Sequence, residues 1–194
     1  MLNNKNDTML KINSQEILEQ FYSPHTTGFN ILVTHSRLVS EKAVRIAKKV
    51  PHLNPDIGFI KEASMLHDIG ICRTNAPNIG CNGEFPYVFH GVKGREMLNS
   101  VGLYRHGLVA ERHTGTGITV QDITERNLGL PVRDMVPVTI EEIIICYADK
   151  FFSKNSKPDH QEKTFDEVVT LLNPFGKKQV DKFIEWAGLF GEKP

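Results

Sequence analysis

The pattern of apolar and polar positions along this chain is mostly that of helices with one buried face. The longest periodic segment runs from about Phe29 to Val50, where apolar residues recur every three or four positions between charged ones, as on a half-buried helix. Shorter segments of the same kind cover about residues 13–21, 55–69, 88–101, 103–114, 119–127 and 139–152, and two more follow residue 160. The sequence therefore predicts an all-α helical bundle.

Chain length and helix-start signals suggest how this bundle is divided. The chain has 194 residues, which fits one domain better than two. We expect an N-terminal helical arm over residues 1–28, in which Asn13 begins a short helix. The core should then cover residues 29–153, and residues 154–194 should form two amphipathic helices that pack on it.

Composition narrows the classes of partner and compartment. The 23 basic and 23 acidic residues give a formal net charge of +0, which argues against a broad nucleic-acid or membrane surface. The segment from Met1 to Asn13 lacks an apolar signal core, and the three cysteines form no CxxC pair. No apolar run approaches the roughly 20 residues of a membrane span. We therefore expect a cytoplasmic protein without a membrane partner or a stable nucleic-acid partner.

The most polar interruption of the apolar pattern is the consecutive pair His67 and Asp68. This pair ends a helical segment, with Gly70 as the expected C-terminal cap, so unpaired backbone carbonyls there favour a cation. Taken alone, a His-Asp pair is more often an ordinary helix end than a metal site. His35 on the long helix faces the same way as the apolar residues, which suits either a hydrogen-bonded core histidine or a ligand.

Three further residues stand where helices begin, end or are buried. His90 lies in the first turn of a helix, and His113 lies at the end of the next one. Asp149 interrupts the apolar run Ile140–Phe152, where an unpaired ionised carboxylate is costly, so it should be ligated to a metal or paired with a cation. His106 shares a helical face with His113, but it neighbours Arg105 and is expected at the surface.

Taken together and in order, these residues resemble the HD-domain metal-dependent phosphohydrolases, and in particular the HDIG subset. Residues 67–70 read His-Asp-Ile-Gly, and the similarity extends from about Thr34 to Lys150. The resemblance implies an all-helical bundle and two divalent metal ions. The implied metal ligands are His35, His67, Asp68 and Asp149 for the first ion, and His90, His113 and a bridging Asp68 for the second.

The resemblance also implies an activity, with Asp68 and His67 as catalytic residues. Two such ions can activate a bridging hydroxide to hydrolyse a phosphomonoester or phosphodiester of a nucleotide or another small molecule. Imidazole-rich ligation favours Fe, Mn, Co, Ni or Zn over Mg. Four cations lie near the ligands in sequence and are candidates to bind the phosphate, although an exposed basic residue is more often simply solvated: Arg73, Lys93, Arg112 and Lys150.

Departures from related patterns limit the substrate. HD-GYP-type phosphodiesterases resemble one another in having a lysine after the HDIG motif, where this chain has Ile71. The GYP tripeptide is also missing, since Gly117 is followed by Ile118 and Thr119. Cyclic dinucleotides are therefore disfavoured. Two other readings stay open: a di-iron HD-domain oxygenase, and a non-catalytic nucleotide-binding domain. The sequence does not indicate an oligomeric state.

A segment rich in Asn, Gly and Pro joins the HDIG motif to the helix that begins near His90. It runs from Ile71 to Pro86, and its composition does not favour a regular element. Loops of this length next to a site often contact the substrate. We expect it to form a mobile rim that selects the substrate, with Cys72 and Cys81 as unrelated thiols.

Overall fold

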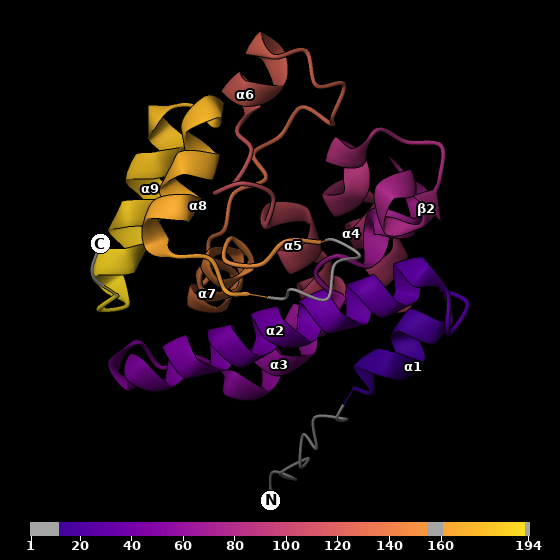
Figure 1. Ribbon diagram of the computed structural model, residues 1–194, viewed down its shortest axis with the longest axis horizontal. Helices are drawn as coiled ribbons and strands as arrows, with labels where there is room; N and C mark the ends of the chain where they lie inside the picture. The colour runs from indigo at the N-terminus through magenta and orange to yellow at the C-terminus, as the bar shows by residue number, and fades with distance from the viewer. Residues whose placement is uncertain (1–11, 155–160, 193–194) are drawn as a thin grey trace, which may run out of the picture.

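The computed structural model describes residues 12–154 and 161–192 of the chain, and its architecture is helical (Figure 1). The prediction of an all-α fold is confirmed: the described residues contain one small sheet, in which β1 (Asn75–Ala76) pairs antiparallel with β2 (Cys81–Asn82). The helices are α1 (Ser14–Glu19), α2 (Thr27–Lys49), α3 (Ile57–Leu66), α4 (His90–Ser100), α5 (Tyr104–Arg112), α6 (Val120–Glu125), α7 (Ile140–Asp149), α8 (Phe165–Leu172) and α9 (Lys177–Leu189).

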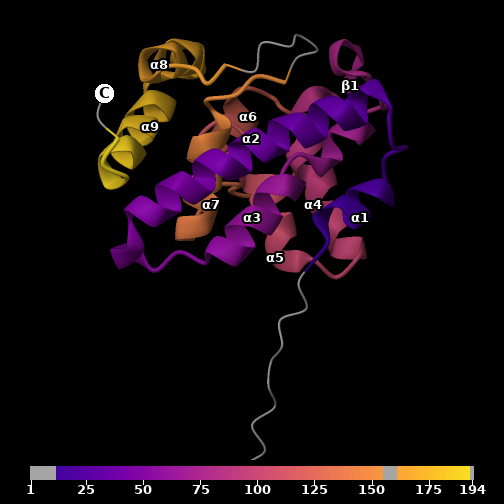
Figure 2. The ribbon, with the colours of Figure 1, turned by 60° about the horizontal axis from the view of Figure 1, so that its bottom comes forward.

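The long helix α2 organises the packing. It runs along one side of the molecule, with α3 beside it, α7 against its middle, and α8 and α9 at the far end from α1 (Figures 1 and 2). The main core joins apolar faces of α2, α3, α7, α8 and α9, and includes the fully buried side chains of Ile46, Tyr147, Phe183 and Trp186. Residues of the C-terminal helices thus share one core with α2 and α7.

Side-chain caps explain where several helices begin. The side chains of Thr26, Asp56, Thr139 and Thr164 each accept a hydrogen bond from a backbone N–H in the first turn that follows, which satisfies an otherwise unpaired donor. These polar residues stop the apolar periodicity at defined positions. As a result, α2, α3, α7 and α8 each begin at a fixed point of the chain.

Gly70 does not cap α3 as the sequence predicted. The helix ends at Leu66 with His67 as its C-terminal cap, and residues Ile69–Arg73 continue as a 3-10 turn. A Cβ on Gly70 would lie 2.1 Å from the His90 carbonyl oxygen and 2.3 Å from the Gly94 nitrogen. Gly70 is therefore needed for close contact between backbones, which places the start of α4 against the turn that carries Asp68.

The expectation of a mobile rim between Ile71 and Pro86 is wrong. Ile71, Ile79 and Cys81 are buried in a second apolar cluster with residues of α1, α2 and α4. Two short 3-10 turns and the β1–β2 pair fold the segment, and Gly80 lies against Gly28 at the start of α2. Short local elements and a few apolar anchors order this segment despite its loop-like composition.

His106 is buried and not at the surface, because its helix face packs on α3. Its ring contacts the Phe59 ring edge-on at 4.8 Å, and its Nε2 lies 3.6 Å from a Glu62 carboxylate oxygen. Burial and the neighbouring Arg105 lower the pKa of His106 to about 4. His106 is therefore a neutral imidazole, since both burial and the positive charge of Arg105 disfavour its charged form.

The expected subdivision of the chain falls partly outside the described residues. Residues 1–11 of the expected N-terminal arm, and residues 155–160 and 193–194 of the expected C-terminal part, lie outside the described residues. Among the described residues, α2 begins at Thr27 and contributes to both main apolar clusters. None of the helices described is both long and apolar enough to cross a membrane.

Candidate metal centre

The structure brings all six sequence-predicted ligands together. Two groups have donor atoms within 4.8 Å of one another, and Asp68 belongs to both. The first group is His35, His67, Asp68 and Asp149, and the second is Asp68, His90 and His113. All six are buried. Helices α2, α4 and α7 and the ends of α3 and α5 supply them, so the cluster exists only because these segments converge.

Backbone carbonyls fix the orientation of three of the four imidazoles. His67 Nδ1 lies 2.6 Å from the Ser64 oxygen, His90 Nδ1 2.8 Å from the Tyr87 oxygen and His113 Nδ1 2.8 Å from the Ala110 oxygen. In each case the acceptor is three residues earlier in the chain. A carbonyl oxygen can only accept, so each Nδ1 carries a hydrogen and each Nε2 is directed toward the cluster, where its deprotonated form presents a lone pair.

This arrangement is the one found around metal-binding histidines. The ligand's second ring nitrogen donates to an oxygen, which fixes the tautomer and the direction of the lone pair. For His67 and His113 the last turns of α3 and α5 supply those oxygens, because the last carbonyls of a helix lack partners within it. For His90 the 3-10 turn Tyr87–Phe89 supplies the oxygen. The position of a histidine at a helix terminus, which the sequence could show, is thus linked directly to its competence as a ligand.

The first group holds two carboxylates close to two imidazoles. His35 Nε2 lies 2.9 Å from Asp149 Oδ1 and 3.2 Å from Asp68 Oδ2, while His67 Nε2 lies 3.1 Å from Asp68 Oδ2. Burial alone would raise the pKa of Asp68, but His67 and Lys154 hold it well below its usual range. Lys150 and Lys154 likewise hold the pKa of Asp149 well below its usual range despite burial, so both carboxylates are ionised at neutral pH.

The second group uses the other oxygen of Asp68. His113 Nε2 lies 3.1 Å from Asp68 Oδ1 and His90 Nε2 lies 3.7 Å from it, with 3.1 Å between the two Nε2 atoms. Burial and the neighbouring His113 lower the pKa of His90 to about 3. Burial likewise lowers the pKa of His113 despite the Asp68 carboxylate. Two neutral imidazoles and one carboxylate oxygen thus face a common point.

His67 behaves differently from the other two. Burial opposes its charged form, but the Asp68 and Asp149 carboxylates outweigh burial and raise its pKa to about 9. A metal ion bound there has to displace a proton below that pH, since metal ligation requires the deprotonated nitrogen. The same negative field that retains the proton also attracts a divalent cation.

The residues present fit divalent metal ions. His67 Nε2 and Asp68 Oδ2 are fully buried, yet neither has a hydrogen bond of good geometry among the described residues. Buried polar atoms are nearly always satisfied, and a metal ion between these two atoms would satisfy both. Imidazole nitrogens and carboxylate oxygens suit ions such as zinc, iron or manganese. The cluster can therefore bind divalent metal.

Lys154, which no sequence motif marks, completes the cluster. Lys154 Nζ lies 2.9 Å from Asp68 Oδ2 and 3.7 Å from Asp149 Oδ1, with 17% of its side chain exposed. Burial opposes its charge, but the two carboxylates raise the pKa of Lys154 well above its ordinary value. In the sequence, the only indication that Lys154 reaches the cluster was its position five residues after Asp149, just past the end of α7.

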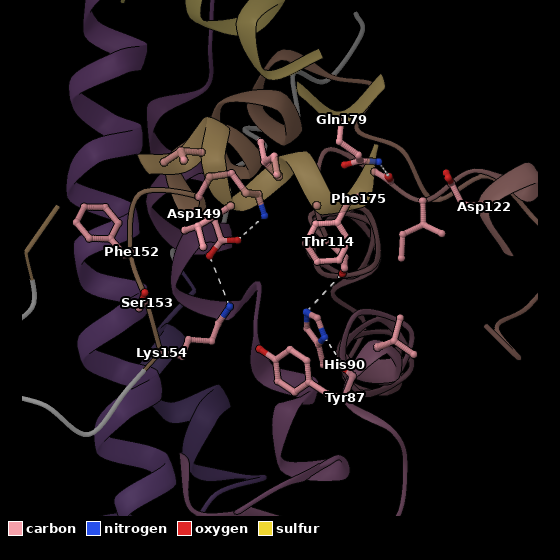
Figure 3. A pocket seen from close by; sticks show the side chains of 18 of the residues that line it. Tyr87, His90, Thr114, Asp122, Asp149, Phe152, Ser153, Lys154, Phe175 and Gln179 are labelled. Carbon is pink, nitrogen blue, oxygen red and sulfur yellow. Dashed lines mark hydrogen bonds and ion pairs between the residues drawn. The ribbon is translucent and has the colours of Figure 1, made fainter. Parts of the chain in front are cut away.

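The cluster forms one wall of a cavity of about 680 Å³. His90 and Asp149 reach this cavity from opposite sides, and Lys154 and Tyr87 point into the space between them (Figure 3). The Tyr87 ring stacks on the His90 ring at 4.7 Å. Such a volume is typical of a small-molecule site. Of the six clustered residues, His90 and Asp149 line this cavity, so a small molecule in it can reach the cluster through these two.

The four cations predicted to bind phosphate are in different places. Lys150 lines the cavity and donates to Asp149 Oδ2 at 2.7 Å and to the His113 carbonyl oxygen at 2.9 Å. Arg112 is held by Glu142, with Nη1 3.0 Å from each carboxylate oxygen. Arg73 and Lys93 line a separate pocket of about 320 Å³. Only Lys150 is brought to the cavity.

Lys163 is a second lysine that the sequence analysis missed. It lines the cavity, is half-buried, and its backbone N–H donates to the Phe151 carbonyl oxygen. Burial lowers the pKa of Lys163, while Asp149 partly offsets that effect. Across residues 12–154 and 161–192, its ammonium forms no ion pair with a carboxylate. No motif marks it, because only tertiary folding brings residue 163 back beside residue 151.

Comparison with known proteins agrees with this geometry. The HD domain family model matches residues 32–153. An uncharacterized protein of Methanocaldococcus jannaschii is 35% identical over 152 residues, which are 76% of this chain and 82% of that protein. A protein of Thermoplasma volcanium named tRNA (cytidine(56)-2′-O)-methyltransferase is 36% identical over 127 residues, 65% of this chain but only 33% of that longer protein.

A solved structure shares the fold. The HD domain of the phosphodiesterase PgpH from L. monocytogenes superposes with a TM-score of 0.50 at 15% sequence identity, covering 92% of this chain and 98% of that one. Identity this low speaks for the fold alone. The family match, in contrast, covers more than half of the chain and contains all six clustered ligands. On both grounds, this chain belongs to the HD domain family.

Proposed function

We propose that this protein is a metal-dependent phosphohydrolase that acts on a nucleotide or another small phosphoester. The observation that carries the proposal is the pair of ligand groups that share Asp68, with three imidazoles oriented by backbone carbonyls. We further propose that each group holds one divalent ion, of Fe, Mn, Co, Ni or Zn. Two bound ions would activate water and neutralise charge on a phosphoester.

Asp68 and the lysines of the cavity have distinct roles in this proposal. Asp68 directs Oδ2 toward the first group and Oδ1 toward the second, so one side chain orients both. Lys150, Lys154 and Lys163 surround Asp149 at the cavity wall. Their ammonium groups can attract a phosphate dianion and hold its oxygens. Positive charge at this position stabilises the transition state, where the negative charge on those oxygens increases.

Tyr87 is placed to interact with the phosphate or the leaving oxygen. Its ring lies against His90 and it lines the cavity (Figure 3). Burial, despite the nearby Lys154, raises the pKa of Tyr87 to about 12. The phenol therefore stays protonated at neutral pH and can donate a hydrogen bond to an oxyanion. This role is compatible with the proposed chemistry but is not essential to it.

The relatives favour a nucleotide over an unrelated phosphoester. Two of them, from Thermoplasma volcanium and Picrophilus torridus, have names that describe methyl transfer to a cytidine of tRNA. This chain matches only about a third of each of those proteins, so their named activity is not assigned to it. Their names nonetheless connect the matched segment with chemistry on nucleotides. The neutral net charge favours a small substrate over a nucleic acid.

Elemental analysis combined with a substrate panel tests the proposal. Protein purified without added metal should contain up to two transition-metal ions per chain. After stripping and reloading with each candidate metal, it should release phosphate from p-nitrophenyl phosphate or from nucleoside phosphates. His52→Ala, at an exposed histidine far from the cluster in sequence, is a matched control that should keep full activity.

Two results would overturn the proposal in favour of a different function. An iron-loaded protein that consumes oxygen with an organic substrate, yet releases no phosphate from any ester, would indicate a di-iron oxygenase. A protein that binds none of the five metals would indicate a non-catalytic domain. Phosphate release that depends on added metal and disappears in Asp68→Ala would support hydrolysis.

A further inference from the structure

Part of the cavity lining is apolar. Six side chains form this surface, here named the apolar wall: Ile118, Leu128, Val168, Leu171, Leu172 and Phe175. Four of the six belong to α8 and the 3-10 turn Asn173–Phe175 that follows it. These four lie outside residues 32–153, the part that matches the HD family model. The segment that supplies them is therefore distinct from the one that supplies the ligands.

Two members of the apolar wall are unusually exposed. Leu171 is 52% exposed and Phe175 is 56% exposed. Large apolar side chains at the surface lose the burial energy that they would gain under a ligand, about 25 cal/mol for each Å² covered. Both line a cavity that also reaches His90 and Asp149. A molecule with its phosphate at the metal cluster can therefore cover them with its other end.

The groups beside the apolar wall indicate what that other end should be. The Arg126 guanidinium lies over the Phe175 ring at 5.6 Å from its centroid, and arginine and aromatic rings both stack on flat nucleobases. Gln179 also lines the cavity near Phe175 (Figure 3). A flat, uncharged aromatic group would stack on Phe175 and remain within reach of this amide.

Gln179 has one hydrogen-bond donor to spare. Its Oε1 accepts from the Thr116 backbone nitrogen at 2.6 Å and from the Thr116 hydroxyl at 2.8 Å, and its Nε2 donates to the Gly117 oxygen at 3.0 Å. These bonds hold the amide rigidly, and the second Nε2 hydrogen remains available to an acceptor in the cavity. A nucleobase offers ring nitrogens or carbonyl oxygens as such acceptors.

We infer that the substrate is a nucleoside monophosphate whose base stacks on Phe175, with Leu171 and Gln179 as further specificity-determining residues. This inference rests on the proposed hydrolase function and deepens it. The phosphate lies among Lys150, Lys154 and Lys163, and the ribose spans the middle of the cavity. The C-terminal helices therefore select the substrate, and the HD segment supplies the metal ligands.

A comparison of substrates that differ only in the base tests the inference. The panel contains the 5′- and 3′-monophosphates of adenosine and cytidine, ribose 5-phosphate, which lacks the base, and n-hexyl phosphate, which is apolar but not flat. For the best nucleotide, kcat/KM should exceed that of ribose 5-phosphate by at least about tenfold, since stacking of one base is typically worth that much or more. n-Hexyl phosphate should be intermediate.

Substitution of Phe175 assigns that preference to the apolar wall. Phe175→Ala should lower kcat/KM for the nucleotide by about tenfold, mainly through KM, and leave ribose 5-phosphate unchanged. Phe175→Trp should restore the preference. Tyr104→Ala is the matched control, because Tyr104 is 67% exposed and is not among the residues that line the cavity. Tyr104→Ala should change kcat/KM for neither substrate.

Several outcomes would overturn the inference while leaving the hydrolase function intact. These are equal kcat/KM for nucleotides and ribose 5-phosphate, n-hexyl phosphate as the best substrate, or an equal loss on both substrates in Phe175→Ala. If no ester is hydrolysed, the proposed function fails, and calorimetric titration still decides the inference. Metal-stripped protein should then bind adenosine 5′-monophosphate more tightly than ribose 5-phosphate, and Phe175→Ala should remove the difference.

Discussion

The two ends of the cavity are built in different ways. At the metal cluster, buried side chains from five helices are held by hydrogen bonds to backbone carbonyls and by short contacts with carboxylates. At the apolar wall, the half-exposed side chains of Leu171 and Phe175 and the buried side chains of Val168 and Leu172 present an apolar surface. Metal binding requires donor atoms at fixed positions, whereas recognition of a ligand by its shape requires only apolar area in the right place.

The two ends also depend on different parts of the chain. The cluster lies within the HD segment, and the apolar wall lies mostly after it. Changes at the cluster should therefore act on metal content and turnover for every substrate. Changes in the C-terminal helices should act on substrate preference or stability and leave the metals in place. Single substitutions at the cluster and in the C-terminal helices test this division.

Asp68→Ala should abolish turnover. Its two oxygens serve both ligand groups, so the variant loses the only carboxylate of the second group and leaves the buried Lys154 ammonium without its closest partner. We expect metal content near zero and kcat/KM lower by a factor of at least about 10³. Metal analysis and phosphate release measure both effects. A variant that keeps two metals and measurable turnover would show that Asp68 is not shared.

His90→Ala should affect one group and spare the other. His90 belongs only to the second group, and its Nε2 is 3.1 Å from that of His113. The protein should fold, keep about one metal per chain and lose activity by a factor of about 10² to 10³. Metal-to-protein ratio and kcat are the measurements. Unchanged metal content and activity would contradict the two-metal assignment.

Lys154→Met should move two measurements in opposite directions. The Lys154 ammonium lies within 4 Å of both carboxylates of the first group, so it competes with any divalent cation for the same negative charge. Its removal should tighten metal binding by about tenfold or more. It should also lower kcat/KM by about tenfold if the lysine holds the phosphate.

Lys48→Met, at an exposed position on α2, is the control for this change and should leave both measurements alone. Weaker metal binding in Lys154→Met would mean that the lysine organises the carboxylates and does not compete for them. Unchanged kcat/KM would remove Lys154 from the phosphate site while leaving its electrostatic role.

Glu192→Gln should have the smallest effect, on stability only. Glu192 follows α9 and joins it to α2 through Lys42 at 3.3 Å and Lys49 at 3.1 Å. Burial opposes its charge, but these lysines lower the pKa of Glu192 below its ordinary value of 4.5. The loss should be about 1 kcal/mol in the free energy of unfolding at pH 7.

The pH dependence of that loss has a defined sign. Because the folded-state pKa is depressed, the stabilisation is fully present above the unfolded pKa near 4.5 and is lost as pH falls through the folded value. Urea unfolding should therefore separate wild type from Glu192→Gln at pH 7 and bring them together as pH falls through the folded-state pKa, below 4.5. Glu185→Gln, in an exposed pair with Lys182, should match wild type at both pH values.

Much of the fold was predictable because helix formation leaves a local signal. The apolar period of residues 29–50 placed α2 to within two residues, and Thr139 marked the start of α7. The ligand set came from order along the chain, His35, His67, Asp68, His90, His113 and Asp149, read through a family resemblance. For His67, His90 and His113, the carbonyl three residues earlier fixes Nδ1, which explains why these three histidines suit a metal.

Contacts between distant elements decided the rest. The sequence by itself determined the helices and the candidate ligands, because periodicity, capping and residue type act within a few positions. Only tertiary structure buried His106 on α3, packed residues 71–86 into a core, and required Gly70 for its close contact with α4. It alone brought Lys154 and Lys163 to Asp149 and made Phe175 line the same cavity as His90, because which side chain faces a site depends on how distant helices pack together.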